Sequence, residues 1–204
     1  MTDPKKGRAE ENRPRAIFIV DDESLIRLGM ENMVARQSPD PIYTFATAED
    51  ALAQLERLRP RVVLMDIQLG NGMTGLEAAR QVMERRPCPV IITTAYADDE
   101  YLAEAMQAHV FGYLVKPVAP QQLASAMALA QNRFEEFERL QSENANLRDA
   151  IETRKVVERA KGLLMEKKKL TEAQAYRILQ TKSQEQGRAM REVAQNVLDA
   201  ADFL

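Results

Sequence analysis

Short apolar runs alternate with longer amphipathic stretches through the first 120 residues of the chain. Each apolar run is four or five residues long and is bounded by charge, proline or glycine, which is typical of a buried parallel strand. The five runs lie at 16–20, 42–45, 62–66, 90–93 and 112–115. Strands that alternate with helices predict a doubly wound parallel sheet, with strand order 2-1-3-4-5.

The stretches between the runs predict helices at 24–37, 47–59, 74–86 and 98–108. Thr47 and Thr74 each precede an acidic residue by three positions, which is the pattern of a helix N-terminus with a capping box. The first of these helices has an apolar stripe, which consists of Leu25, Leu28, Met30 and Met33.

Beyond Pro120 there is no further proline, and glycine is absent until Gly162, so a long helix is expected. Apolar residues with 4-3-4-3 spacing predict the seam of a dimeric coiled coil. The seam consists of Leu123, Met127, Ala130, Phe134 and Phe137, slips at Leu140, and resumes through Asn144, Leu147 and Ile151. A buried Asn144 would fix the register of the two copies. The alternative is a helix packed on its own domain, which is less favoured because the seam is longer than such a helix needs.

The last fifty residues predict three short helices. The first ends near Lys168, the second is capped by Thr171 and ends near Gln186, and the third spans 189–201. Their apolar residues can close a small core, which would contain Val156, Val157, Ala160, Leu163, Leu164, Tyr176, Ile178, Leu179, Val193, Val197 and Leu198. The expected division is a disordered lead at 1–15, an α/β domain at 16–120, a coiled-coil linker at 121–150 and a three-helix domain at 151–204.

Composition narrows the class of protein. Apolar residues make up 45% and charged residues 29%, as in ordinary soluble proteins. The net charge of −3 does not by itself indicate a nucleic-acid partner. No apolar run approaches the roughly 20 residues of a membrane span, and the first fifteen residues lack the apolar centre of a signal peptide. The lone Cys88 excludes an internal disulfide, so a cytoplasmic location away from the membrane is expected.

Polar residues follow four of the predicted strands: Asp21 and Asp22, then Asp66, Thr94 and Lys116. Because the carboxyl ends of parallel strands meet at one edge of a sheet, these side chains should lie together. Three carboxylates suit Mg²⁺, which prefers oxygen ligands. One oxygen of Asp66 would remain free for in-line attack on a phosphoryl group, Lys116 would offset its charge, and Thr94 would donate a hydrogen bond to it.

Residues 16–120 resemble the receiver domain of two-component response regulators. The resemblance rests on Val-Asp-Asp at 20–22, Met-Asp-Ile at 65–67, Gly-Leu-Glu at 75–77, Thr-Ala at 94–95 and Gly-Tyr-Leu-Val-Lys-Pro at 112–117. It implies that Asp66 accepts a phosphoryl group from a sensor histidine kinase, and that the domain catalyses only its own phosphorylation and dephosphorylation. It therefore implies a regulator rather than an enzyme.

The resemblance also implies roles for individual residues. Mg²⁺ would be held by Asp21, Asp22, Asp66 and the backbone carbonyl of Gln68. Thr94 and Tyr113 would form a switch pair, in which Thr94 turns toward the phosphoryl group and Tyr113 rotates inward. Lys116 would contact the phosphate, and the bond between Lys116 and Pro117 would be cis.

The loop after Asp66 departs from the family pattern. Members usually have Pro-Gly after the phosphoacceptor, whereas this chain has Leu-Gly-Asn-Gly-Met at 69–73. The loop is expected to be more mobile for this reason, which leaves the rate of phosphate loss open.

The C-terminal segment 147–200 resembles ANTAR domains, the RNA-binding modules of transcription antitermination regulators. The matching segments are Arg-Ala-Lys-Gly-Leu-Leu-Met at 159–165, Ala-Tyr-Arg-Ile-Leu at 175–179 and Met-Arg-Glu-Val-Ala at 190–194. The resemblance implies binding to RNA with paired hairpins. The candidate contacts are Lys161, Tyr176, Arg177 and Arg188, although Tyr176 is equally expected in the core.

The resulting hypothesis is a cytoplasmic homodimeric response regulator that binds paired hairpins and acts by antitermination. Three rivals remain. A DNA-binding regulator would prefer duplex DNA with symmetric half-sites. A phosphatase of the aspartyl-phosphate class would turn over a phosphorylated metabolite. A protein-binding adaptor would bind no nucleic acid in any phosphorylation state.

Overall fold

The computed structural model describes residues 16–70, 72–95 and 110–201. The predicted lead at 1–15 and the predicted helix at 98–108 lie outside these residues. The chain divides into two compact units, residues 1–137 and 138–204. Each unit is described by itself.

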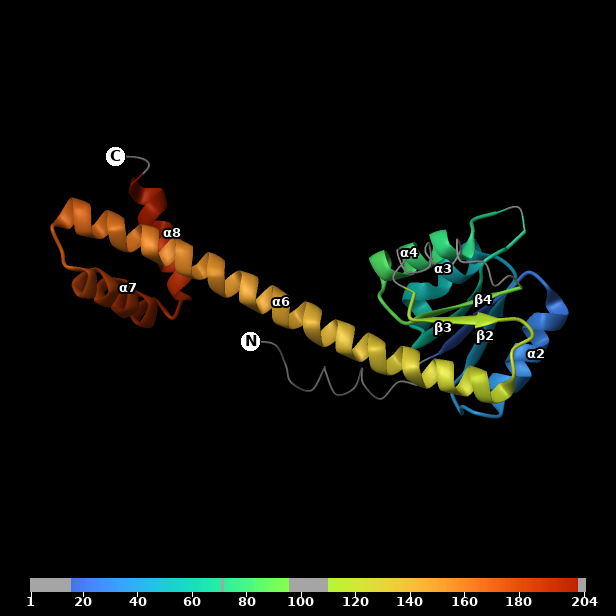
Figure 1. Ribbon diagram of the computed structural model, residues 1–204. Helices are drawn as coiled ribbons and strands as arrows, with labels where there is room; N and C mark the ends of the chain where they lie inside the picture. Colours follow the sequence, from blue (N-terminus) through green and yellow to red (C-terminus); the bar gives the residue numbers. More distant parts are fainter. Residues whose placement is uncertain (1–15, 71, 96–109, 202–204) are drawn as a thin grey trace. The chain divides into compact units, whose positions relative to one another are not determined.

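The first unit contains a five-stranded parallel sheet (Figure 1). Its strands are β1 (Ile17–Val20), β2 (Ile42–Phe45), β3 (Val62–Asp66), β4 (Val90–Thr94) and β5 (Gly112–Val115). They lie in the order β2-β1-β3-β4-β5, which confirms the predicted topology. The residues of β1, β3 and β4 are all buried, as the unbroken apolar runs indicated.

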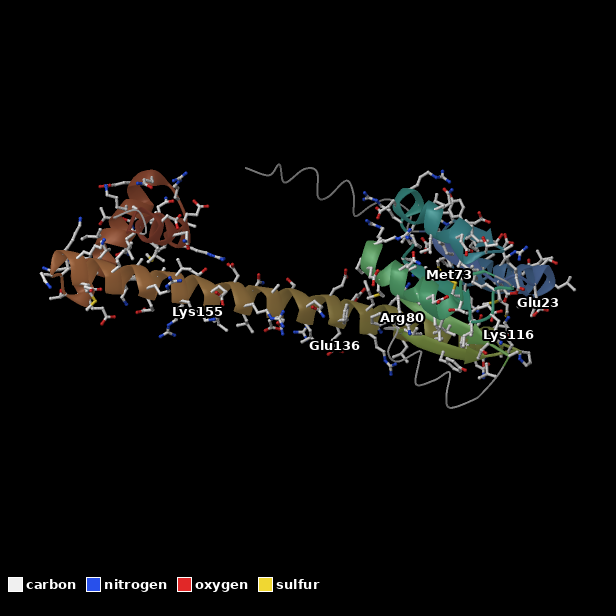
Figure 2. The ribbon with its side chains drawn as sticks, turned by 90° about the horizontal axis from the view of Figure 1, so that it is seen from above. Glu23, Met73, Arg80, Lys116, Glu136 and Lys155 are labelled. Carbon is white, nitrogen blue, oxygen red and sulfur yellow. The ribbon has the colours of Figure 1, made fainter. Side chains whose placement is uncertain are left out.

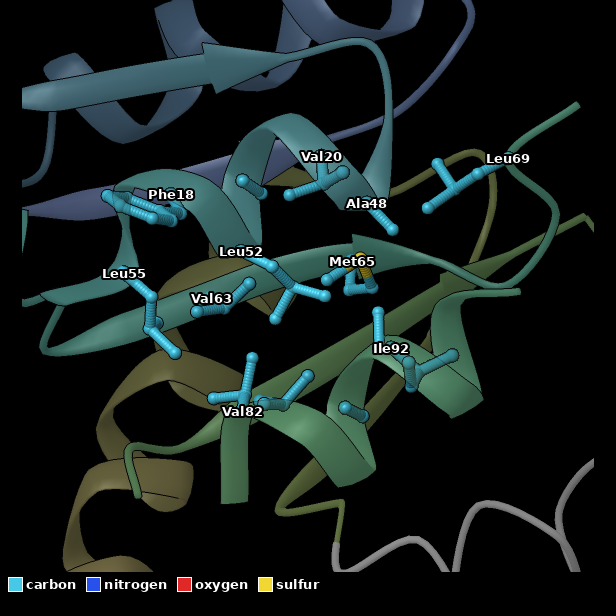
Figure 3. Packing of buried hydrophobic residues seen from close by; sticks show 14 of the residues in the cluster. Phe18, Val20, Ala48, Leu52, Leu55, Val63, Met65, Leu69, Val82 and Ile92 are labelled. Atoms are coloured by element: carbon cyan, nitrogen blue, oxygen red, sulfur yellow. The ribbon is translucent and has the colours of Figure 1, made fainter. Parts of the chain in front are cut away.

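Helices cover both faces of this sheet. One face packs against α3 (Ala48–Leu58) and α4 (Gly75–Arg85), and Figure 3 shows Leu52 and Leu55 of α3 close to Val63 of β3. The other face packs against α2 (Ser24–Ala35) and the beginning of α6 (Pro120–Lys168). The predicted N-terminal caps of α3 and α4 are confirmed, because Thr47 and Thr74 each accept a hydrogen bond from the third residue beyond them.

The predicted apolar stripe of α2 was partly wrong. Leu25 is 83% exposed and Leu28 is 55% exposed. The stripe that faces the sheet instead consists of Ile26, Met30, Met33 and Val34. These four follow the i, i+4, i+7, i+8 spacing of one helix face, and Leu25 and Leu28 lie off it.

The first part of the predicted coiled-coil seam belongs to the core of the first unit. Leu123, Met127 and Ala130 are buried against the sheet, and the ring of Phe134 lies 5.2 Å from that of Phe111. A coiled-coil seam and a helix face on a sheet have the same spacing, so the pattern could not separate them. The second part is different, because Leu140, Leu147 and Ile151 are 52%, 61% and 55% exposed.

The second unit packs the end of α6 against α7 (Glu172–Gln186) and α8 (Met190–Ala201). Thr171 forms a capping box with Gln174 at the start of α7, and Gly187 ends the helix with a φ of 60°. The buried residues of this core are Val157, Ala160, Leu164, Ala175, Leu179, Val193 and Ala194. Tyr176 is 43% exposed and lies outside the core.

None of the described helices combines the length and the apolar content that crossing a membrane requires.

Candidate functional site

Three carboxylates meet at the carboxyl edge of the sheet. Asp21 follows β1 and is fully buried, Asp22 is exposed, and Asp66 at the end of β3 is 6% exposed. One oxygen from each of the three lies within 4.8 Å of the others. Because β1 and β3 are neighbours in the sheet, the topology alone brings these acids together.

Lys116 comes to the same place from the end of β5. Its Nζ lies 2.8 Å from Oδ2 of Asp21 and 3.1 Å from Oδ2 of Asp66. Burial raises the pKa of Asp66, and the charge of Lys116 opposes that rise without cancelling it. Burial alone would lower the pKa of Lys116, but the hydrogen bond that Lys116 donates to Asp21 and the charge of Asp66 raise it overall. Lys116 is therefore held as a cation.

A cavity of about 510 Å³ opens beside these groups. Asp66, Gln68, Thr94 and Lys116 line it, and Thr94 is buried. Met73 and Lys116 both line this cavity, and both are labelled in Figure 2. The cavity has space and polar groups for a small anion beside Asp66.

The second residue of the implied switch pair, Tyr113, lies on β5. Tyr113 is half-buried, pairs with Ile92 of β4 and packs against the core beneath α3 and α4. The peptide bond between Lys116 and Pro117 is cis, which agrees with the expectation.

Gly75 allows α4 to begin directly against the end of β3. A Cβ at this position would lie 1.9 Å from the carbonyl oxygen of Asp66, so only glycine fits. The N–H of Gly75 donates to the carbonyl of Ile67 at 2.8 Å. This contact fixes the backbone that carries Asp66.

Two residues at this edge were not foreseen from the sequence. Arg27 of α2 donates to the carbonyl of Asp21, and Glu49 of α3 accepts the N–H of Met73 at 3.1 Å. Acidic residues in a first helical turn are favoured by the helix dipole, so the pattern gave Glu49 no further role. The role of Glu49 becomes visible only through its contact with Met73, which lies in the loop before α4.

The residues present fit a divalent cation that takes oxygen ligands. Asp21, Asp22 and Asp66 bring three negative charges to one edge, and Lys116 offsets only part of them. Such a cluster favours a small divalent cation. The backbone of Gln68 follows Asp66 by two residues at the wall of the same cavity.

The candidate RNA contacts in the second unit lie in two different environments. Tyr176, Arg177 and Arg188 are exposed. Lys161 is only 6% exposed, and its Nζ lies 2.9 Å from Glu158 and 2.7 Å from Glu172. It therefore ties α6 to the start of α7, and this placement argues against a contact with RNA.

A doubly wound sheet whose carboxyl edge carries three carboxylates, a threonine and a lysine defines a receiver-type regulatory domain. Residues 17–128 match the response regulator receiver domain family, and residues 145–198 match the ANTAR domain family. The chain therefore belongs to the response regulators, with an N-terminal receiver domain and a C-terminal ANTAR domain.

One relative matches along most of the chain, and another matches along about half of it. The transcriptional regulatory protein PdtaR of Mycobacterium tuberculosis is 33% identical over 186 residues, which cover 91% of this chain and 90% of that protein. The positive alginate biosynthesis regulatory protein of Pseudomonas aeruginosa is 36% identical over 116 residues, 56% of this chain and 46% of that protein.

The fold is also similar to solved structures. The CheY-like response regulator receiver domain protein from Methanospirillum hungatei superposes with a TM-score of 0.56 at 27% identity, over 61% of this chain and 98% of that one. A receiver domain from a Desulfovibrio desulfuricans diguanylate cyclase gives a TM-score of 0.56 at 28% identity, over 60% of this chain and 98% of that one.

Proposed function

We propose that this protein is a cytoplasmic, phosphorylation-controlled regulator that binds paired-hairpin RNA and acts by transcription antitermination. One observation carries the proposal: the acidic edge of a receiver domain and an ANTAR domain occur in one chain, joined by the single helix α6. A sensor histidine kinase would supply the phosphoryl group.

Asp66 is the proposed phosphoacceptor. Its Oδ2 is paired with Lys116 at 3.1 Å, which leaves Oδ1 to attack phosphorus. The bond from phosphorus to the donor breaks, the donor leaves, and an aspartyl phosphate forms. Asp21, Asp22, Asp66 and the carbonyl of Gln68 would hold Mg²⁺, which supplies charge neutralisation for the phosphoryl oxygens.

The donor is proposed to dock on α2. Leu25 and Leu28 are large apolar residues exposed to solvent within seven positions of Asp21. Exposed apolar side chains beside a reactive edge suit a protein donor, because they can be buried when the donor arrives. This use also explains why α2 keeps leucine at two positions that do not face the sheet.

The proposed switch connects Asp66 to α6 within the first unit. Thr94 would turn toward the phosphoryl group and Tyr113 would rotate inward. Two residues before Tyr113, the ring of Phe111 lies 5.2 Å from that of Phe134 and 5.7 Å from that of Phe137. A shift of β5 would therefore be felt by α6 through a packed aromatic cluster.

RNA is proposed to bind the exposed surface of the second unit. Tyr176 can stack on a base, and Arg177 and Arg188 can contact phosphates or base edges. Basic side chains of α6 can add to this surface, because Arg154, Lys155 and Arg159 line a hollow together with Ile151 and Glu158. Lys161 would support this surface from below by holding α7.

The proposed homodimer uses the exposed face of α6. Leu140, Leu147 and Ile151 lie on one side of the helix with Asn144, and a second copy in parallel would bury all four. With Asn144 in the seam, Glu143 and Arg148 fall at the flanking positions that pair between parallel helices. This charge match favours a second copy of the same chain as the partner.

Phosphorylation is tested with acetyl phosphate and Mg²⁺ on the wild type, Asp66→Asn and Asp50→Asn. Asp50 is an exposed aspartate on α3 and serves as the matched control. We expect phosphoryl incorporation in the wild type and in Asp50→Asn, and none in Asp66→Asn. Stable incorporation at another residue of Asp66→Asn would refute the assignment.

RNA binding is tested by titration with a two-hairpin RNA and with duplex DNA of matching sequence. We expect the RNA to bind more tightly, and Arg177→Ala and Arg188→Ala to weaken it, whereas Lys182→Ala serves as an exposed basic control. Preference for the duplex would favour a DNA-binding regulator. Absence of binding to either nucleic acid would favour a protein-binding adaptor.

A further inference from the structure

The loop between β3 and α4 is held from a neighbouring helix by a carboxylate. Oε1 of Glu49, in the first turn of α3, accepts the backbone N–H of Met73 at 3.1 Å. The same carboxylate lies against Gly72, where a Cβ would stand 3.1 Å from Oε1 and 3.4 Å from Oε2. Gly72 therefore lets the carboxylate reach the loop backbone.

The anchored residues form part of the wall of the cavity beside Asp66. Gly72 and Met73 both line that cavity. The sulfur of Met73 also accepts a hydrogen bond from Nε2 of Gln81 at 3.3 Å. The wall is thus tied to α3 through the backbone of Met73 and to α4 through its side chain.

Glu49 is not needed to build α3 itself. Thr47 already caps this helix by accepting from the N–H of Asp50, and Asp50 places another negative charge in the first turn. The side chain of Glu49 is directed instead to a different element. Its hydrogen bond is charge-assisted, which makes it stronger than a neutral one.

We propose that Glu49 is a positioning residue for phosphoryl chemistry at Asp66, because it holds the wall at Gly72 and Met73 and so restricts water. The inference rests on the proposed phosphorylation of Asp66. In the reaction that ends the signal, a water oxygen attacks phosphorus and the bond from phosphorus to the Asp66 oxygen breaks. The carboxylate is restored, and the proton of the water goes to the released phosphate.

A hydrogen bond and a negative charge predict different results for two substitutions. Glu49→Ala removes both, whereas Glu49→Gln removes the charge and keeps an oxygen that can accept the N–H of Met73. If the hydrogen bond positions the wall, the glutamine variant, which keeps a weaker neutral bond, should have a phosphate half-life closer to that of the wild type than to that of Glu49→Ala. If the charge mattered by repelling anions, the two variants should behave alike.

Gly72→Ala is an independent way to break the hydrogen bond between Glu49 and the N–H of Met73. Its Cβ would press on the far end of the Glu49 side chain, which can swing away at little cost to the fold. The displaced carboxylate would then release Met73. Asp50→Ala is the matched control, since it removes a neighbouring acid that is hydrogen-bonded to Thr47.

The experiment measures the half-life of the aspartyl phosphate on the full chain after acetyl phosphate is removed in the presence of Mg²⁺. Hydrogen exchange of the Met73 amide and the thermal midpoint are measured alongside. We expect Glu49→Ala to shorten the half-life about threefold to tenfold, the factor that one hydrogen bond of about 1 kcal/mol supports. Gly72→Ala should also shorten the half-life.

Met73 exchange should rise in both of these variants while the thermal midpoint changes little. Asp50→Ala should match the wild type, and Glu49→Gln should lie closer to the wild type than Glu49→Ala does. An unchanged half-life in Glu49→Ala, or equal shortening in the alanine and glutamine variants, would overturn the positioning role. A wild-type protein that takes up no phosphoryl group would overturn the proposed function as well.

Discussion

Two lysines, one in each unit, lie between two carboxylates, and both have a raised pKa. The partners of Lys116 are themselves buried, because the side chains of Asp21 and Asp66 are 0% and 8% exposed. The partners of Lys161 remain in water, with Glu158 and Glu172 55% and 69% exposed.

The difference separates a reactive site from a structural ion pair. At Lys116, the acids are held out of water by a rigid sheet, so an arriving cation or phosphoryl group changes a balance of buried charge. At Lys161, the acids remain solvated and the lysine links two helices. Ion pairs with exposed acids contribute little to stability, so the main effect of this one is to hold the two helices in place. A basic residue in a family motif therefore does not by itself identify a ligand contact.

The largest expected effect concerns the backbone of the buried site. Gly75→Ala places a Cβ 1.9 Å from the carbonyl oxygen of Asp66, where backbone cannot move aside. We expect a loss of about 1–3 kcal/mol of unfolding free energy, or more. Gly29→Ala is the control, since a Cβ there meets nothing within 4 Å and should stabilise α2 by at most about 1 kcal/mol. Denaturant titration of both variants measures the contrast, and equal stabilities would contradict it.

The comparison of the lysines is tested directly by replacing each with methionine. Lys116→Met removes a cation that lies within 3.1 Å of oxygens of Asp21 and Asp66. We expect Mg²⁺ affinity to rise about tenfold, because the repulsion between the two cations is lost. Lys161→Met should leave Mg²⁺ affinity unchanged. Calorimetric titration measures both, and a fall in affinity for Lys116→Met would show that Lys116 does not compete with the metal.

The ion pair in the second unit predicts a smaller, pH-dependent effect. The hydrogen bond from Lys161 lowers the pKa of Glu172 below its usual value. The stabilisation is therefore present above the unfolded-state pKa of glutamate, about 4.3, and is lost as the pH falls through the lower folded pKa. The raised pKa of Lys161 removes its contribution only above about pH 10.4. Protection of the α7 amides from hydrogen exchange, corrected for the intrinsic effect of pH on the exchange rate, should fall on acidification, and Glu172→Gln should show less of this fall.

The smallest expected change concerns Gly162 on α6. A Cβ at this position meets nothing within 4 Å, so nothing among the described residues requires glycine. Gly162→Ala should stabilise the second unit by about 0.5–1 kcal/mol through helix propensity. If a second copy or the RNA backbone approaches closely here, the same change should weaken dimerisation or RNA binding. Sedimentation measures dimerisation of the variant, and titration measures its RNA affinity. A gain in stability with dimerisation and RNA affinity both unchanged would exclude a close approach.

The sequence predicted the first unit well because its signals are local. Apolar runs located the strands, and the residues that follow them located the carboxylates of Asp21 and Asp66 and the amine of Lys116. Capping patterns also located the helix starts after Thr74 and Thr171. These features depend on a few neighbouring residues, and parallel strands bring their ends together without further information.

The features that could not be predicted from the sequence depend on which elements pack against each other. The 4-3-4-3 spacing of α6 did not distinguish the sheet beneath Leu123 from a second helix, and Leu25 was assigned to a stripe that it does not join. The burial of Lys161 follows from the position of α7, and the contact of Glu49 with Met73 follows from the packing of α3 beside the loop. Tertiary contacts of this kind leave no periodic signal.

The most direct test of the account is the affinity of the full chain for a two-hairpin RNA, measured with and without acetyl phosphate in Mg²⁺, for the wild type and for Asp66→Asn. We predict that phosphorylation tightens binding in the wild type and leaves the Asp66→Asn variant unchanged, since the switch begins at that carboxylate. RNA binding that is equally tight in all four measurements would contradict control by phosphorylation.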